Sequence, residues 1–136
     1  MPDTEIAHLT DRLMRRINAT LNAKADEFDH HSVGPVGGIF LLTLAESEPA
    51  RIQDLVNLTS RDKAQTTRVV QMLEQKGLIE RRSTPDDARV SLLSLTSEGR
   101  KTVGTIQHAV AEALSEILAP LSSADKHDLK KILRRI

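Results

Sequence analysis

The sequence predicts a mainly α-helical (α+β) fold, and three observations support this class. Apolar residues recur at intervals of three and four along most of the chain, as they do on amphipathic helices. Only the region 79–95 holds two short runs of strand-favouring residues, which are separated by a turn. A length of 136 residues fits one domain, 1–136, and its core must be aliphatic because Phe28 and Phe40 are the only aromatic residues.

The composition excludes several classes of protein. The absence of cysteine excludes disulfides and a thiol redox sensor. Without a long apolar run or a signal peptide, we expect a soluble, cytoplasmic protein. The sequence has no phosphate-binding loop, nucleophile motif or carboxylate pair of fixed spacing, so we expect neither an enzyme nor a cofactor. Zero formal net charge argues against a general polyanion binder, although residues 60–91 hold seven Lys/Arg against five Asp/Glu.

Residues 3–28 are predicted to form one long helix. A helix of this length with an apolar stripe needs a partner to bury the stripe. The stripe consists of Ile6, Leu9, Leu13, Ile17, Leu21 and Phe28.

A second helix is predicted to open at Pro35, because proline is favoured in the first helical turn. Gly37 and Gly38 each weaken this helix by up to roughly 1 kcal/mol relative to alanine. Two explanations are open: close backbone packing against a neighbouring helix, or fraying at the start of the helix. Its apolar residues are Val36, Ile39, Phe40, Leu41, Leu42 and Leu44.

A short helix with Ile52, Leu55, Val56 and Leu58 and a longer helix over 62–76 form a predicted helix-turn-helix pair. Asp62 is expected to cap the longer helix, and Gln65 completes the pattern of a capping box. Gly77 is expected to end it.

One face of the helix 62–76 is polar but carries no carboxylate, whereas solvated faces usually mix acids and bases. Backbone N–H groups and long polar side chains at a helix N-terminus suit DNA, because phosphates bind there and base edges accept from Arg, Lys and Gln. We therefore interpret 62–76 as a DNA-reading helix. The apolar face consists of Thr66, Val69, Val70 and Leu73, and the polar face of Ala64, Arg68, Gln71 and Gln75.

Residues 79–83 and 89–95 are predicted strands, joined by a loop over 84–88 in which Pro and Asp favour a turn. Arg81, Arg82 and Arg89 give this hairpin a positive edge. A helix followed by a basic hairpin is the layout of a winged helix-turn-helix, with the wing at 83–89.

The C-terminal part is predicted to form two helices. Thr96 is expected to cap the first, which runs to about Ala119 before Pro120. Ser122 and Asp125 form a capping-box pattern for the last. The apolar residues of the two helices are Val103, Ile106, Val110, Leu114 and Ile117, then Leu129, Ile132, Leu133 and Ile136.

We expect the terminal regions 1–30 and 100–136 to supply dimerisation helices, because their apolar stripes lie far in sequence from the reading helix. A two-fold dimer would place two reading helices about one DNA turn apart, roughly 34 Å, and would require a pseudo-palindromic operator.

A motif downstream of the reading helix resembles the wing-to-helix motif of the MarR family of bacterial transcription regulators. The form D-x-R-x5-L-T-x-x-G-R is met at Asp87, Arg89, Leu95, Thr96, Gly99 and Arg100, and the segment 77–82 is also similar to that family. Two positions depart from the family pattern: Arg61, where an apolar residue is typical, and Thr66, in place of the usual Val.

The resemblance implies a homodimeric DNA-binding regulator, a repressor that covers promoter DNA, with its DNA-binding region at 35–95. Arg68 is expected to reach a base edge. Asp87 is expected to hold Arg89 at the minor groove or a phosphate. The DNA-binding residues are predicted to be Lys63, Ala64, Gln65, Thr67, Arg68, Gln71, Arg82, Asp87 and Arg89.

Simpler explanations stand beside these predictions. Arg89 and Asp87 could form an ordinary surface ion pair, worth about 0–1 kcal/mol. Either Arg81 or Arg82 could pair with Glu80 or Asp86 instead of approaching phosphate, and Arg100 is expected to be structural, bracing the wing. The alternative function is a winged-helix module that binds protein instead of DNA.

Metal and effector sites remain hypotheses. His30 and His31 follow Asp26 and Glu27 by four residues, and Glu112 follows His108 by four, but no pair completes a ligand set, so we predict no metal. The resemblance implies that a small aromatic anion could act as effector. A pocket for it would be aliphatic here, with Arg15, Arg16 or His8 as polar anchors.

Overall fold

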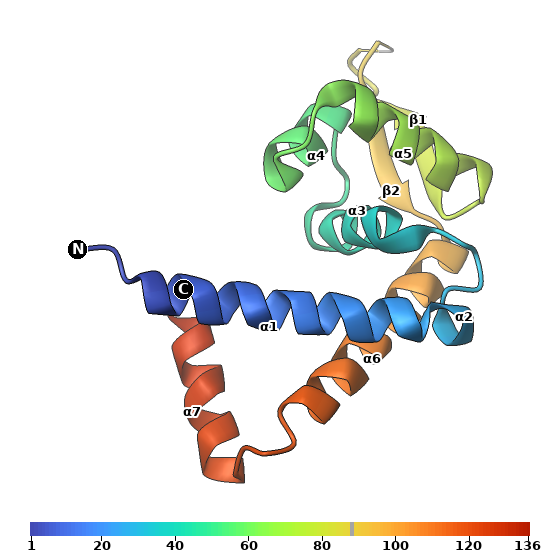
Figure 1. Cartoon of the computed structure of the whole chain (residues 1–136). Helices are drawn as coiled ribbons and strands as arrows, with labels where there is room; N and C mark the ends of the chain where they lie inside the picture. The colour runs from blue at the N-terminus through green and yellow to red at the C-terminus, as the bar shows by residue number, and fades with distance from the viewer. Residues whose placement is uncertain (88) are drawn as a thin grey trace. The chain divides into compact units, whose positions relative to one another are not determined.

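The computed structural model describes residues 1–87 and 89–136 as seven helices and a two-stranded sheet (Figure 1). Ala88, part of the predicted wing loop and of the Asp87-Ala88-Arg89 motif, lies outside the described residues. The predicted fold class is confirmed, with seven helices against about six expected. None of the helices in the described ranges combines the length and apolarity needed to cross a membrane.

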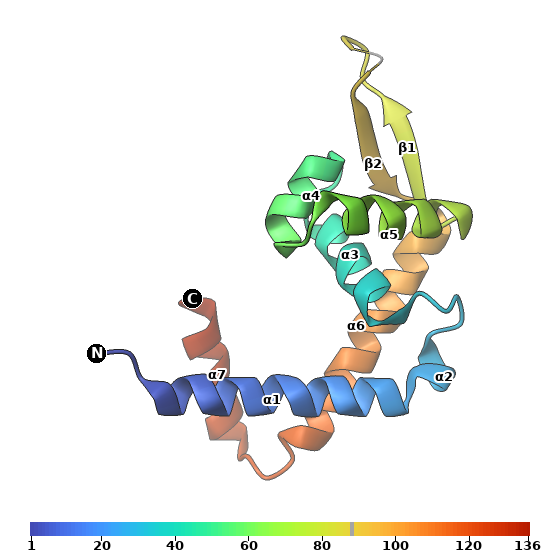
Figure 2. The same ribbon diagram turned by 45° about the horizontal axis from the view of Figure 1, so that its top comes forward.

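The chain divides into two compact units, and the first comprises residues 25–107. Three helices and a hairpin make up most of it, and the hairpin projects from the helices in both views (Figures 1 and 2). Its elements are α2 (Ala25–Phe28), α3 (Gly34–Ser47), α4 (Ile52–Thr59), α5 (Lys63–Gln75), β1 (Ile79–Ser83), β2 (Ser91–Leu95) and the first part of α6 (Ser97–Ile117).

The core of this unit is aliphatic apart from Phe40, as the composition predicted. Its central side chains come from α3, α4, α5 and the hairpin, and each is completely buried. Burying a side chain of this size contributes roughly 1.5–3 kcal/mol relative to leaving it exposed. These side chains are Phe40, Leu41, Leu44, Leu55, Val70, Leu73, Leu78 and Leu93.

The two adjacent glycines of α3 are both buried within the helix. A Cβ atom at Gly37 would lie 2.9 Å from the Val33 Cβ and 3.3 Å from the Met72 Cε of α5. Close packing therefore accounts for Gly37, but mainly against the start of its own helix, since the only atom of a neighbouring helix among the three nearest is the end of the Met72 side chain. At Gly38 a Cβ would have its nearest contact at an ordinary 3.8 Å. The start of α3 is also capped, because the Asp29 carboxylate accepts from the backbone N–H groups of Val33 and Gly34, each at 2.9 Å.

The boundaries of α5 follow the predicted signals. The Asp62 carboxylate accepts from the Gln65 backbone N–H at 2.7 Å, which confirms the cap, and Gly77 follows the helix with a φ of +74°. Thr66 is completely buried, and its hydroxyl donates to the Asp62 carbonyl at 2.8 Å. That hydrogen bond lets Thr occupy a core position where the MarR pattern has Val.

The hairpin pairs β1 with β2 in antiparallel register, with Ile79 opposite Leu95 and Arg81 opposite Leu93. Leu93 also exchanges two backbone hydrogen bonds with Ala50, at 2.7 and 3.0 Å. β2 therefore has a neighbour on each edge, β1 on one side and Ala50 on the other. These contacts anchor the hairpin to the core.

The prediction that the second strand starts at Arg89 is wrong, because β2 starts at Ser91. Two backbone hydrogen bonds hold Val90 in the turn: the Val90 N–H donates to the Asp87 carbonyl, and the Val90 carbonyl accepts from Thr84, each at 3.1 Å. Turn formation thus takes precedence over the strand preference of Val90.

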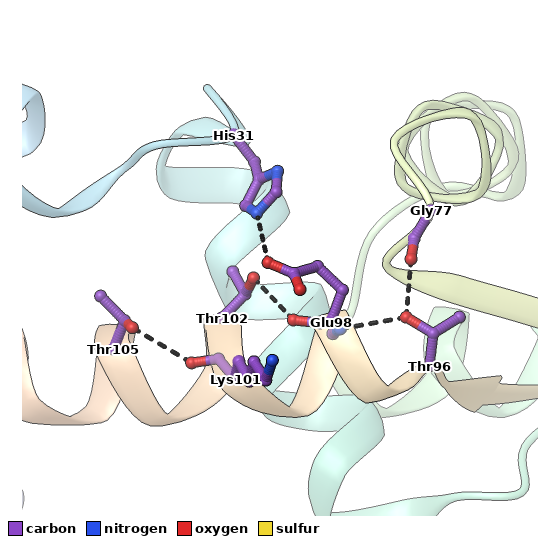
Figure 3. Close-up of polar contacts among 8 residues, drawn as sticks. His31, Gly77, Thr96, Glu98, Lys101, Thr102 and Thr105 are labelled. Carbon is purple, nitrogen blue, oxygen red and sulfur yellow. Dashed lines mark hydrogen bonds and ion pairs between the residues drawn. The ribbon is translucent and has the colours of Figure 1, made fainter.

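Thr96 links the end of α5 to the start of α6, directly after the hairpin (Figure 3). The Thr96 hydroxyl donates to the Gly77 carbonyl at 2.6 Å and accepts from the Gly99 N–H at 3.0 Å, which confirms the predicted cap of α6. The Thr96 N–H donates to the Leu78 carbonyl at 3.1 Å. A Cβ at Gly99 would lie 2.0 Å from that same carbonyl oxygen, so only glycine fits there.

The second unit comprises residues 1–24 and 108–136, with α1 (Thr4–Ala23), the end of α6 and α7 (Ser123–Arg134). The predicted capping box of α7 is confirmed by reciprocal hydrogen bonds between Ser122 and Asp125, each at 3.1 Å. One helix over 3–28 is a wrong prediction, because α1 ends at Ala23 and α2 begins at Ala25. The Lys24 N–H bonds to the carbonyls of Thr20 and Leu21, which closes the last turn without Gly or Pro to signal it.

Replacing Gly99 with alanine should lower the free energy of unfolding by about 1–3 kcal/mol, because the new methyl group must displace the Leu78 carbonyl. Urea denaturation followed by circular dichroism would measure the change. Gly104→Ala is the matched control in the same helix, because nothing lies within 4 Å of its Cβ position. It should raise stability by up to about 1 kcal/mol, and equal effects of the two changes would contradict the packing argument.

Candidate nucleic-acid interface

The outer face of α5 is exposed, as its sequence pattern predicts. Ala64, Arg68, Gln71 and Gln75 are all exposed, whereas Thr66, Val70 and Leu73 on the opposite face are buried. Val69, predicted for the buried face, is half-buried at its margin. The helix is therefore anchored by one side and presents polar side chains without a carboxylate on the other.

The first turns of α5 hold the other residues predicted to face DNA. Lys63 is exposed, and Gln65 and Thr67 are half-buried. The Thr67 hydroxyl donates to the Lys63 carbonyl at 2.8 Å, so its proton is used within the helix and its oxygen remains available as an acceptor. Asp62 lies at this end as well, and its carboxylate is directed to the backbone of Gln65.

The described residues of the wing tip form a hydrogen-bonded turn. The Thr84 hydroxyl accepts from the Asp87 N–H at 3.0 Å and donates to the Asp87 carbonyl at 2.8 Å. The Asp87 carboxylate accepts from the Arg89 N–H at 2.9 Å and lies 3.3 Å from its Nε. The Arg89 side chain is nevertheless 92% exposed, so the turn orients Arg89 without covering it.

The two neighbouring arginines of β1 have different surroundings. Arg81 binds the Glu74 carboxylate of α5, with Nη2 at 2.7 Å and Nε at 3.4 Å. Arg82 lies 3.0 Å from Glu80 and remains 77% exposed. A pair between Arg82 and Glu80 is one of the simpler explanations that the sequence offered. The sequence did not indicate Glu74 as the partner of Arg81.

The helix-turn-helix also carries cations that lack a carboxylate partner. Within the part of the chain that the structure describes, Arg61, Lys63 and Arg68 form no ion pair. Arg61, which departs from the MarR pattern, is half-buried in the turn between α4 and α5. Lys76, at the end of α5, is exposed and likewise has no ion pair among the described residues. Three of these four cations lie on the turn and the first half of α5.

Glu48 is a residue that sequence reasoning missed. Its carboxylate accepts two hydrogen bonds from the Arg100 guanidinium, at 2.8 and 3.0 Å, and a third from the Leu95 N–H at 3.3 Å. Arg100 thus has the structural role predicted for it, at the base of the wing. No local pattern links Glu48 to Arg100, because fifty-two positions separate them.

Two of the three histidines considered as metal ligands pair with a carboxylate. The His31 Nε2 lies 3.2 Å from the Glu98 carboxylate (Figure 3), and the His108 Nε2 lies 2.9 Å from the Glu112 carboxylate. His30 is exposed. Among the described residues, no three His, Cys, Asp or Glu side chains gather in a way that could hold a metal ion.

Comparison with known proteins identifies the family. Residues 40–91 match the model of the MarR family. The uncharacterized HTH-type transcriptional regulator YdgJ of Bacillus subtilis is 32% identical over 97 residues, which are 71% of this chain and 59% of YdgJ. The crystal structure of apo MarR from Escherichia coli superimposes with a TM-score of 0.79 at 20% identity, covering 99% of this chain and 96% of that one. A second regulator of Bacillus subtilis, the uncharacterized HTH-type transcriptional regulator YxaD, is 32% identical over 98 residues, which are 72% of this chain and 68% of YxaD. The chain belongs to the MarR family.

A further relative extends the match along the chain. The transcriptional repressor MprA of Escherichia coli is 26% identical over 131 residues, 95% of this MarR-family chain and 70% of MprA. The chain spans less than two thirds of the length of YdgJ. These relatives are named as transcription regulators.

Proposed function

We propose that this MarR-family regulator binds a pseudo-palindromic operator as a homodimer. α5, within the predicted 62–76, would lie in the major groove, and the wing at 83–89 would contact the minor groove. The observation that carries the proposal is the carboxylate-free, exposed face of a helix whose opposite face is buried. A helix held in this way can enter a groove without disturbing the core behind it.

The residues proposed to contact DNA divide into two groups. Arg68 and Gln71 carry long donors on the exposed face, and these suit base edges. Lys63, Arg82 and Arg89 carry exposed charges that suit phosphates or the minor groove. The remaining proposed contacts are Ala64, Gln65 and Thr67 at the start of α5, with Asp87 orienting Arg89.

The proposal of a dimer rests on the helices of the second unit. No residue of α1 or α7 is buried in the single chain. Large apolar side chains on both are exposed, which costs free energy in water unless a partner covers them. These are Ile6, Leu9 and Met14 of α1 and Ile132 and Leu133 of α7. We therefore propose 1–30 and 100–136 as the dimerisation helices and 35–95 as the DNA-binding region of a single domain, 1–136.

A groove in the second unit supports the same proposal. It has a volume of about 190 Å³ and lies between α1 and the α6–α7 turn. Its apolar lining continues the stripe of α1, so it suits an apolar segment of a second copy. Of the predicted effector anchors, Arg16 lines this groove, whereas Arg15 pairs with Asp11 at 3.0 Å. The lining consists of Leu9, Arg12, Leu13, Arg16, Ile117, Leu118, Pro120 and Leu121.

Repression is the proposed outcome of binding. A dimer that covers promoter DNA excludes other proteins from it, and the relative MprA is named a repressor. A small-molecule effector that changes the separation of the two reading heads would release the operator, because both heads must fit one DNA face at once.

The alternative is a winged-helix module that binds protein. An electrophoretic mobility shift with the DNA upstream of the protein's own gene decides between the two. A specific shift that resists excess unrelated DNA supports the proposal. Failure to bind this DNA, or any site recovered by selection from random sequences, favours the protein-binding module.

Arg68 and Arg89 should make different contributions to DNA binding. Arg68→Ala should cost about 1–3 kcal/mol of operator affinity and relax the preference at one base pair in each half-site. Arg89→Ala should weaken binding to all sequences and lower the salt slope by about 1, with little change in melting temperature because the side chain is 92% exposed. Fluorescence anisotropy at several salt concentrations measures both.

Lys101→Ala removes an exposed cation outside the proposed interface and serves as the control for general loss of charge. It should leave the salt slope unchanged. An Arg89→Ala variant with the wild-type affinity at two salt concentrations would remove the wing from the interface.

Introducing a charge on the apolar face of α7 should dissociate the dimer. Leu133→Glu places a carboxylate at a position that is 58% exposed in the single chain, so the fold itself should tolerate it. Analytical ultracentrifugation at micromolar concentration should show a dimer for the wild type and a monomer for the variant. Lys130→Glu on the same helix is the control and should remain dimeric, whereas a monomeric wild type would contradict the dimer.

A further inference from the structure

Arg81 and Arg82 are adjacent on β1 and therefore point to opposite faces of the hairpin. Arg82 lies near Glu80 on its own face and is 77% exposed. Arg81 turns to α5, where the Glu74 carboxylate receives its Nη2 at 2.7 Å and its Nε at 3.4 Å. The side chains of Arg81 and Glu74 are 35% and 28% exposed, so this pair is the less hydrated of the two.

Glu74 is the only acidic residue between the first and last residues of α5. An unpaired carboxylate on a helix that lies against DNA would repel the phosphates on either side of the groove. The Arg81 guanidinium binds both oxygens of this carboxylate and cancels its charge. The Arg81–Glu74 pair lies where the hairpin leaves the core. Along β1, Ile79 is still buried and Arg82 is already exposed.

From this geometry we infer that Arg81 is a positioning residue that acts on DNA binding through Glu74 and is not itself a phosphate ligand. Its guanidinium holds the Glu74 carboxylate against β1 and cancels the one negative charge within α5. Arg82, whose side chain is 77% exposed on the other face, makes the phosphate contact. This inference rests on the proposed DNA-binding function.

Three variants measured with the full-length protein test the inference: Arg81→Ala, Glu74→Gln and the double variant. Operator affinity is measured by fluorescence anisotropy at several salt concentrations and well below each melting temperature. Arg81→Ala should weaken binding about three- to tenfold, because it leaves the Glu74 charge uncancelled beside the phosphates. Glu74→Gln should bind at least as tightly as the wild type, since its amide oxygen still accepts from Arg81. The double variant should recover to within about twofold of the wild type.

Two other results would overturn the inference. A double variant as weak as Arg81→Ala would show that Arg81 contacts phosphate itself. Equal losses of affinity in Arg81→Ala and Glu74→Gln, in step with their melting temperatures, would show that the pair only supports the fold.

Arg82→Ala and its combination with Glu80→Gln are the matched controls on the neighbouring position. The loss of affinity in Arg82→Ala should persist in the combination, because the arginine itself contacts phosphate. Recovery there as well would mean that any added positive charge restores binding, and would overturn the special role of Arg81. A wild-type protein that binds no operator would contradict the proposed function instead, before any variant is compared.

Discussion

The placement of the hairpin depends on one backbone contact, between the Leu78 carbonyl and the start of α6. This carbonyl accepts from the Thr96 N–H, and its oxygen lies where a side chain at position 99 would have to begin. The Leu78 N–H is bonded to the Leu73 carbonyl of α5. The backbone of one residue, Leu78, thus fixes the end of α5, the start of β1 and the start of α6. Residues 95, 96 and 99 of the family motif therefore describe a packing requirement, separate from any contact with DNA.

Electrostatics divides the basic residues of the helix-turn-helix and the hairpin, with Arg100 at its base, into two sets. Arg81, Arg82, Arg89 and Arg100 each have a carboxylate partner. Among the residues described, Arg51, Arg61, Lys63, Arg68 and Lys76 have none. The paired arginines are all on the hairpin or at its base, where they must be oriented. An exposed pair contributes little to stability, about 0–1 kcal/mol, so its main effect is to restrict where the guanidinium points. Orientation, more than total charge, distinguishes this neutral protein from a general polyanion binder.

Most of the fold could be predicted from the sequence because its signals are local. Asp62, Thr96 and Ser122 cap helices through side chains that reach only three residues along the chain. The face of α5 follows from a helical period, which does not depend on the rest of the molecule. The family motif then identified the wing, including the orientation of Arg89 by Asp87.

The two wrong boundaries lack a local sequence signal, and the two missed contacts join residues of different elements. The break at Lys24 has no Gly or Pro to mark it, and Val90 favours a strand by residue type but is bonded into the turn. Glu48 meets Arg100, and Glu74 meets Arg81 across a turn, and neither spacing is one that a single helix or strand would bring together. These contacts exist only once the tertiary structure has formed. Helical periodicity and capping patterns therefore could not predict these contacts.

The two edges of the hairpin have different exposure to other chains. Ala50 occupies the outer side of β2 at Leu93, whereas β1 pairs with β2 alone among the described elements. An open strand edge is a template for association with another molecule's strand, and natural proteins guard such edges with charge. Here the edge strand reads Ile-Glu-Arg-Arg-Ser, so three consecutive charged side chains line it. The charged residues of β1 therefore disfavour pairing between the hairpins of neighbouring molecules at high protein concentration.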